Sequence, residues 1–131
     1  MAIIGIALSP DAQTSRAIIL PFDCDAGAAV GDWVYPDPAN DLKVLVNSNN
    51  TVIEETIGVI YEKPTTTTAN VLIMGIATGY SGLTLGGKIF LSTSGVATQV
   101  PPTSGYVQVL GVAVSDTDVL IKPSTERVKR I

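Results

Sequence analysis

Residues 31–35 read Gly-Asp-Trp-Val-Tyr, and residues 86–90 read Gly-Gly-Lys-Ile-Phe. Each stretch is followed by an apolar Gly-Val pair and later by a Val-Leu-Ile triplet. The pair and the triplet lie at Gly58-Val59 and Val71–Ile73 in the first half of the chain, and at Gly111-Val112 and Val119–Ile121 in the second. The three offsets are 55, 53 and 48 residues. A pattern that recurs in the same order predicts a tandem repeat of one β motif, with shorter loops in the second copy.

The composition favours an all-β fold. The chain has 131 residues, is 46% hydrophobic but only 5% aromatic, and contains twelve Gly and eight Pro. Many β-branched residues between frequent turn residues are typical of short strands, and this length suits one domain. We therefore expect a small β-barrel or sandwich over residues 16–122. Two diverged copies of the motif, at about 19–73 and 74–121, would build it.

Nine segments are expected to form strands, and no window shows the apolar spacing of a helix. The expected strands are Arg16–Phe22, Asp32–Tyr35, Leu42–Val46, Thr51–Glu62, Val71–Ala77, Lys88–Ser92, Val96–Val100, Tyr106–Val114 and Asp118–Lys122. Gly58 is expected to mark a bulge, and Pro64 with Thr65–Thr68 to form an exposed loop. The segments on either side of Thr93-Ser94-Gly95 are expected to pair as a hairpin, and a turn at Ser115-Asp116-Thr117 to join the last two strands.

The low content of charged residues indicates either a well-buried barrel or a subunit interface. Charged residues make up 15% of the chain, well below the ~25% of an ordinary domain. The segment Val71–Ala77 has no polar position, and Tyr106–Val114 has only Gln108. Such strands are expected to be covered on both faces, as in a sandwich core or between the subunits of a trimer. We therefore expect a homotrimer.

The charge is distributed unevenly along the chain. Residues 122–131 carry a net charge of +3, while residues 1–121 hold four basic and eleven acidic groups, a net charge of −7. An acidic body argues against a nucleic-acid-binding face. A single cysteine forms no internal disulfide, and neither a signal peptide nor a run of ~20 apolar residues is recognisable. We expect synthesis in the cytoplasm and no membrane or nucleic-acid partner.

The residue types needed for catalysis or metal binding form no recognisable set. The chain has no His, which is the commonest general base near neutral pH and the commonest metal ligand. Cys24 lies between two aspartates that disfavour its thiolate, so an inert, partly buried side chain is expected. The acidic residues lack the spacing of a calcium loop and are expected to accept hydrogen bonds in turns; they are Asp23, Asp25, Asp32, Asp37, Asp41, Asp116 and Asp118.

Two further patterns favour structure over ligand binding. The glycines at Gly79–Gly82 and Gly86-Gly87 lack the Lys-Ser/Thr of a phosphate loop, and no helix is expected after them. The aromatic residues are scattered over separate segments, which favours core and rim packing over a platform for sugar stacking; they include Trp33, Tyr35, Tyr61, Tyr80 and Tyr106. We therefore expect no enzyme activity, no cofactor, no metal and no small-molecule substrate.

The two ends of the chain are the candidate partner-contacting segments. Residues 1–15 are expected to form an arm, whose apolar part Met1–Leu8 is set apart by Pro10 and a polar linker. The basic tail, residues 123–131, is expected to leave the body after Pro123 and to dock on an acidic surface with an apolar notch. The candidate contact residues are Ile3, Ile4, Ile6 and Leu8 in the arm, and Lys122, Arg127, Val128, Lys129, Arg130 and Ile131 at the basic end.

The second half of the chain resembles the head-fibre and capsid-decoration proteins of tailed phages. The resemblance lies in Gly75-Ile76-Ala77, in the run from Gly82 to Ser92 with its glycines and Phe-Leu-Ser, and in Thr98–Gly105 with its double proline. Val107–Ala113 continues the module, and Ala28–Tyr35 resembles the strand entry of small capsid cement proteins. Altogether the similarity covers roughly residues 19–122.

This resemblance implies a structural function. Proteins of that family form trimers on the outside of a phage head, bridge neighbouring major capsid subunits and reinforce the shell. We expect such a cement function on the capsid exterior, with the arm adding a strand to a capsid sheet edge. One alternative is a head-fibre or tail appendage module that binds host-surface glycans. Another is a small trimeric β-barrel enzyme, which would need a carboxylate–metal–phosphate site that the sequence does not reveal.

Overall fold

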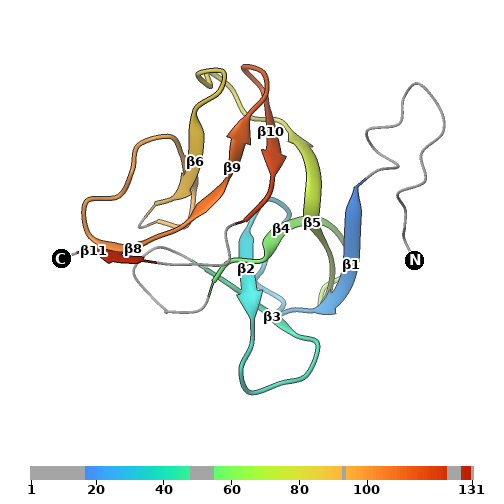
Figure 1. Ribbon diagram of the computed structural model, residues 1–131. Helices are drawn as coiled ribbons and strands as arrows, with labels where there is room; N and C mark the ends of the chain where they lie inside the picture. Colours follow the sequence, from blue (N-terminus) through green and yellow to red (C-terminus); the bar gives the residue numbers. More distant parts are fainter. Residues whose placement is uncertain (1–16, 48–54, 93, 124–127, 131) are drawn as a thin grey trace, which may run out of the picture.

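The described part of the chain is entirely β-structure. The computed structural model describes residues 17–47, 55–92, 94–123 and the backbone of 128–130, and these residues form eleven strands and no helix (Figure 1). The all-β prediction is therefore confirmed. The strands are β1 Ile18–Asp23, β2 Trp33–Pro36, β3 Val44–Val46, β4 Gly58–Thr65, β5 Thr68–Thr78, β6 Lys88–Leu91, β7 Ala97–Thr98, β8 Gly105–Val107, β9 Val109–Ala113, β10 Asp118–Ile121 and β11 Val128–Arg130.

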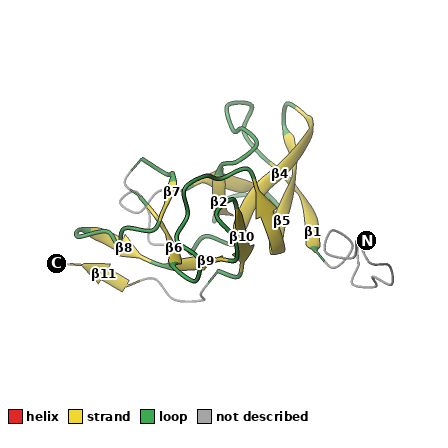
Figure 2. Ribbon diagram, turned by 90° about the horizontal axis from the view of Figure 1, so that it is seen from above, coloured by secondary structure: helices red, strands yellow, loops and turns green. Residues whose placement is uncertain are grey.

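One antiparallel sheet curls into a half-barrel (Figures 1 and 2). Its strand order is β3-β2-β4-β5-β10-β9-β6-β7, and β1 pairs with β5 in addition. A separate ladder joins β8 to β11. The long strand β5 pairs with β1 and β4 along its first half and with β10 along its second half. It therefore links the two halves of the curled sheet.

The strands fall into two units with the same pairing register. In the first unit, β3-β2-β4-β5, Trp33 pairs with Val59 and Val59 with Leu72. In the second unit, β7-β6-β9-β10, Lys88 pairs with Val112 and Val112 with Leu120. Turn hydrogen bonds recur as well, because Gly31 donates to the Ile60 carbonyl and Gly86 to the Ala113 carbonyl, both at 2.9 Å. Residues separated by 55, 53 or 48 positions therefore occupy equivalent places in the two units.

The glycine of each Gly-Val pair allows a close approach between neighbouring strands. A Cβ atom on Gly58 would collide with the carbonyl oxygen of Leu72, and one on Gly111 would collide with that of Leu120. These carbonyls belong to the middle residue of each Val-Leu-Ile triplet. The repeated sequence pattern thus reflects a contact in which backbone touches backbone, so only glycine fits without a shift of the sheet.

Buried apolar side chains form two clusters on opposite faces of the first unit. The inner core lies on the concave side and combines both units; it contains Ala17, Trp33, Val59, Leu72, Ile89, Leu91, Leu110, Val119 and Ile121. The outer cluster belongs to the first unit and contains Cys24, Ala28, Val34, Val44, Ile60, Ala69 and Val71, with Phe22, Ile57 and Ile73 half-buried against it. The first unit is therefore a sheet with two apolar faces.

A β-bulge in β5 decides which face of each unit turns inward. Ile19 pairs with Leu72 whereas Ile18 pairs with Met74, so Ile73 is an extra residue on β5. Such an insertion reverses the alternation of side chains along a strand. Leu72 accordingly packs in the inner core, and Ala77, five residues later, packs against that same core. Equivalent residues of the two units therefore point to opposite sides of the curled sheet.

Several local predictions are confirmed and others are wrong. The hairpin between β6 and β7 and the turn between β9 and β10 are present. Part of the expected strand Thr51–Glu62, residues 51–54, lies outside the described residues. In the described part, β4 begins at Gly58 and runs on to Thr65, and its irregularities lie after Ile60 and not at Gly58. The expected exposed loop is confirmed for the turn Thr66-Thr67 alone, because Thr65 and Thr68 pair with each other at the ends of β4 and β5. Pro64 is tolerated in β4 because the register is irregular there.

The basic tail also differs from the prediction. Its residues Val128–Arg130 form strand β11, which pairs with Gly105–Val107. The expectation that the tail leaves the β body is therefore wrong for this stretch of backbone. The remaining tail residues, 124–127 and 131, lie outside the described residues.

Replacing either close-approach glycine by alanine is expected to destabilise the sheet. Gly58→Ala and Gly111→Ala each force a methyl group against a backbone carbonyl, so each should lower the free energy of unfolding by about 1–3 kcal/mol. Gly27→Ala is the control, because a Cβ there meets nothing within 4 Å and should cost less than ~0.5 kcal/mol. Urea denaturation measures all three. Equal stability of the three variants would contradict the close-approach interpretation.

Candidate interaction surface

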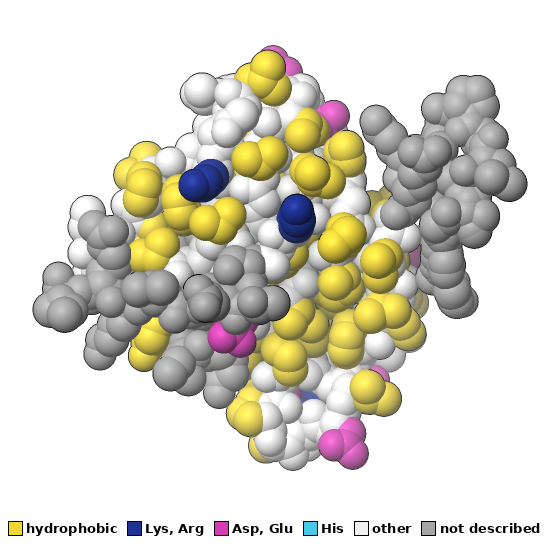
Figure 3. Space-filling view, viewed as in Figure 1, with side chains coloured by type: hydrophobic (Ala, Val, Ile, Leu, Met, Phe, Trp, Pro, Cys, Tyr) yellow, Lys and Arg dark blue, Asp and Glu magenta, His cyan; other side chains and the backbone are white. Residues whose placement is uncertain are grey.

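The convex face of the first unit leaves large apolar side chains in contact with solvent. Among them Ile18 and Leu20 of β1 are each 42% exposed, Met74 of β5 is 44% exposed and Val46 of β3 is 45% exposed. Ile57 and Ile73 are half-buried beside them. Figure 3 shows a continuous apolar area over the region of β1, β2 and β5. We call these six residues the outer face.

Strand pairing explains why these residues gather. Leu20 lies opposite Val71, and Val46 lies opposite Val34, so both exposed residues extend rows whose central members are buried. The bulge adds Ile73 and Met74, which line one cavity together although they are adjacent in sequence. The sequence prediction that β5 is covered on both faces does not hold for the single chain, since Met74 is exposed.

Two charged side chains of opposite sign border the outer face. Glu55 and Lys122 are exposed and line a cavity of about 280 Å³ together with Ile57, Ile73 and Met74. Within the described residues the structure contains one ion pair, and it joins Lys43 to Asp25 elsewhere. Neither Glu55 nor Lys122 therefore has an opposite charge bound to it among the described side chains. An apolar floor with both charges at its margin is suited to contact with another protein surface.

A buried amide holds the margin of this face in place. The side chain of Gln108 accepts a hydrogen bond from the Thr56 backbone N–H at 2.8 Å and donates to the Thr56 carbonyl at 2.9 Å. Thr56 Oγ1 in turn accepts a hydrogen bond from Asn47 Nδ2 at 3.0 Å. All three residues are buried. This network fixes Thr56, and with it the neighbours Glu55 and Ile57, against the second unit.

The sequence showed Gln108 as the one polar position of a long apolar strand but not its role. In the structure the expected strand Tyr106–Val114 is divided at this residue into β8 and β9. The strand divides where the amide reaches across to Thr56, 52 positions away in the chain. A buried glutamine in an apolar run was the available signal, because a buried amide needs partners for its donors and acceptor.

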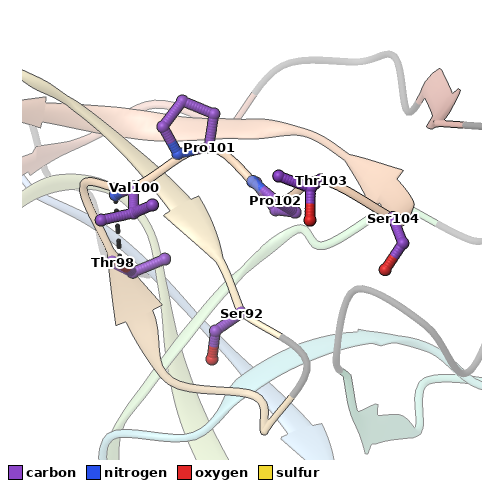
Figure 4. A pocket seen from close by; sticks show the side chains of 7 residues that line it. All are labelled: Ser92, Thr98, Val100, Pro101, Pro102, Thr103 and Ser104. Atoms are coloured by element: carbon purple, nitrogen blue, oxygen red, sulfur yellow. Dashed lines mark hydrogen bonds between the residues drawn. The ribbon is translucent and has the colours of Figure 1, made fainter.

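A second hollow lies between β7 and β8, and Figure 4 shows it from close by. Hydroxyl groups and two prolines line it, with Val100 at its edge. Val100 N–H donates to Thr98 Oγ1 at 3.1 Å, which fixes the backbone beside the prolines. No aromatic side chain lines the hollow. Trp33 and Tyr35 are buried, which confirms the prediction of core packing for these two residues and removes them from any sugar-stacking surface.

The predicted partner-contacting residues fall into three groups. The arm residues Ile3, Ile4, Ile6 and Leu8 lie outside the described residues, as do Arg127 and Ile131. Val128, Lys129 and Arg130 are described by their backbone alone, in β11. Lys122 is the one whose side chain has a described setting, beside the outer face. Ile18, Leu20 and Met74 could not be predicted as contact residues from the sequence, because both faces of these strands are apolar.

Two of the predicted aspartates accept backbone hydrogen bonds in turns, as expected, and a third forms an ion pair. Asp32 accepts a hydrogen bond from the Ala29 N–H, and Asp37 accepts from the Ala39 N–H, both at 2.9 Å. Hydrogen bonds from Asn40 and from that backbone N–H lower the pKa of Asp37. The carboxylate of Asp25, 2.8 Å from Lys43, raises the pKa of the lysine.

Two further side chains with potentially reactive groups are half-buried or buried. Burial raises the pKa of Tyr80, and Cys24 is buried as a free thiol. The described residues contain no group of three or more His, Cys, Asp or Glu side chains arranged to hold a metal ion. They also contain no helix long and apolar enough to cross a membrane.

Comparisons with known proteins give no family for this chain. No protein-family model, no curated protein and no solved structure matches it.

Loss of the buried amide is expected to cost more stability than loss of an equivalent exposed one. Near the surface, the side chain of Gln99 makes the same two hydrogen bonds to the backbone of Thr84. It accepts from the Thr84 N–H at 2.8 Å and donates to the Thr84 carbonyl at 2.9 Å. Gln108→Ala leaves the Thr56 backbone groups buried and unpaired, so it should lower the free energy of unfolding by about 2–3 kcal/mol. Gln99→Ala, whose partners regain water, should cost about 0.5–1 kcal/mol. Thermal and urea unfolding compare the two, and equal losses would show that burial does not matter at Gln108.

Proposed function

We propose that this chain is a structural protein that decorates the outside of a phage head and stabilises the shell by bridging major capsid subunits. The single observation that carries the proposal is the outer face, an apolar area left in solvent on a rigid sheet. Four of its side chains are between 42 and 45% exposed. Each square ångström of apolar surface removed from water contributes about 25 cal/mol to association. A protein with such a face is suited to binding another protein.

The fold supports a mechanical function. β5 is joined to β1, β4 and β10 by antiparallel ladders, and the inner core ties both units together. A body whose strands are joined by continuous backbone ladders and by one core is suited to carrying a load between its contacts. The resemblance to capsid-decoration proteins indicates the assembly in which such a load would arise, namely the shell of a phage head. In this proposal the protein is a homotrimer on the capsid exterior, made in the host cytoplasm.

The hydroxyl-lined hollow supports the alternative of a head-fibre or tail appendage. Its lining includes Ser92, Thr98, Thr103 and Ser104, and hydroxyl groups can exchange hydrogen bonds with sugar hydroxyls. Sugar sites usually add an aromatic platform, which this hollow lacks. We therefore rank the glycan-binding appendage second.

The copy number in purified particles tests the decoration function. We expect the chain in a fixed ratio to the major capsid protein, over the whole surface of the head, because bridging serves every equivalent capsid site. Heads stripped of the protein should rebind it and gain resistance to heat. A small copy number confined to one vertex or to the tail would contradict decoration and favour the appendage.

Removal of residues 1–9 tests whether the arm contributes to attachment. The proposal assigns Ile3, Ile4, Ile6 and Leu8 to capsid or inter-subunit contact, so the truncated protein should melt within a few degrees of the full chain and lose attachment to heads. The control replaces Ile4, Ile6 and Leu8 by Ser at full length and should behave in the same way. A truncated body that fails to fold would place the arm in the core of its own subunit.

A further inference from the structure

The two units cover equivalent faces in different ways. From the second unit, the inner core contains Ile89, Leu91, Leu110, Val119 and Ile121. Four of these have equivalents in or against the outer cluster of the first unit, namely Val34, Ile57, Val71 and Ile73. Leu91 corresponds to the exposed Pro36. The first unit therefore carries the same kind of face on its convex side. Its centre, Val34 and Val71, is buried, while the surrounding residues of the outer face are half-buried or exposed.

The cover over the second unit comes from the first unit. Trp33, Val59 and Leu72, which form one row across three strands, pack in the inner core. The equivalent row of the second unit is Lys88, Val112 and Leu120, continued by Ile76 opposite Leu120. Lys88 is exposed and the three apolar residues are half-buried. Apolar side chains also gather over β6, β9 and β10 in Figure 3.

Within one chain the contact is made once, between the inner face of the second unit around Ile89 and Val119 and the Trp33–Val59–Leu72 row of the first unit. The two equivalent surfaces, the outer face of the first unit and the Lys88–Val112–Leu120 row of the second, both lie on the convex side. We infer that the outer face binds a second copy of this chain, through the Lys88–Val112–Leu120 row of that copy. This inference deepens the proposed function by naming the two surfaces that join the copies of the proposed homotrimer, and it leaves the arm and the basic end for the capsid. Its test needs no capsid.

Charge supports this choice of occupant. Lys88 stands where the first unit has Trp33, so the contact brings an ammonium group to the outer face. Glu55, which borders that face, is the equivalent of Gln108, the residue that reaches across the internal contact to Thr56. The geometry of the internal contact thus places Glu55 where it can meet the second copy. Its carboxylate is available to Lys88, since neither has an ion pair among the described residues.

The free edge of β1 is a poorer site for a second copy than the face. β1 pairs with β5 along one edge, and at its other edge the Asp23 N–H already donates to the Leu42 carbonyl at 2.9 Å. Pro21, in the middle of the strand, has no N–H to offer. Proline on an edge strand opposes the addition of a further strand. Side chains and not backbone ladders are therefore expected to make the contact.

Sedimentation velocity over a range of micromolar concentrations tests the inference. The full chain should associate reversibly, and Met74→Asp, which places a charge on the outer face, should raise the dissociation constant by at least about tenfold. Val100→Asp is the matched control, because Val100 is 72% exposed but lies in the hydroxyl-lined hollow. It should associate like the original chain. Melting curves check that both variants are folded.

A charge exchange identifies the surface of the second copy. Glu55→Lys and Lys88→Glu should each weaken association about 2–5-fold, and the double variant should recover the original affinity. Both side chains are exposed, so the fold is not at risk. If Met74→Asp abolishes association but the double variant with exchanged charges does not recover the original affinity, the assignment of the Lys88 row is overturned.

A full chain that stays monomeric at all concentrations would overturn the inference as a whole. This failure is distinguishable from a failure of the decoration function. If the chain is monomeric and Met74→Asp nevertheless lowers occupancy on heads, the outer face contacts the capsid, and decoration stands without self-association. If association follows the prediction but the protein is absent from the head surface, the copy contact stands and decoration fails.

Discussion

The extra residue in β5 is the feature on which the rest of this fold depends. β5 is the only described strand that pairs with three others, and its bulge lies between the segment held by β4 and the segment held by β10. A one-residue insertion moves every later side chain to the opposite face of a strand. Because of it, Leu72 and Ala77 both contribute to one inner core. Without the insertion, Val119 and Ile121 would be paired with a strand whose apolar side chains point away from that core.

The reversed orientation of the second unit explains a difference between the two copies of the sequence repeat. The first copy has Trp33 where the second has Lys88, although both residues occupy the same register position. Trp33 is 1% exposed in the inner core, whereas Lys88 lies on the convex side and is exposed. A repeat that kept the same face inward in both copies would require similar residues at both positions. The exchange of Trp for Lys therefore follows from the reversed orientation of the second unit.

The sequence predicted the parts of the fold that local rules determine. Gly-Val pairs and Val-Leu-Ile triplets marked equivalent strands, and turn residues marked the β6–β7 and β9–β10 hairpins. It did not predict the outer face, because strands with apolar residues on both sides carry no period that separates inside from outside. The tight turn at Thr66-Thr67 lacks Gly, Asn and Pro, so no local signal distinguished it from a loop. The division at Gln108 depends on Thr56, a partner that no local rule connects to it.

The geometry of the copy contact bears on the choice between the two functional hypotheses. A contact that joins two different surfaces is heterologous, and it generates a ring when the rotation closes and an open filament when it does not. A ring of three copies suits a threefold position on a head, while an open stack suits a fibre. The same apolar face is compatible with both outcomes, because the rotation between successive copies and not the chemistry of the face decides between them. In the inferred contact, a pair between Glu55 and Lys88 would add one constraint on that rotation, worth only about 0.2–1 kcal/mol for exposed side chains. The fit between the two apolar surfaces is therefore the main determinant of whether the assembly closes.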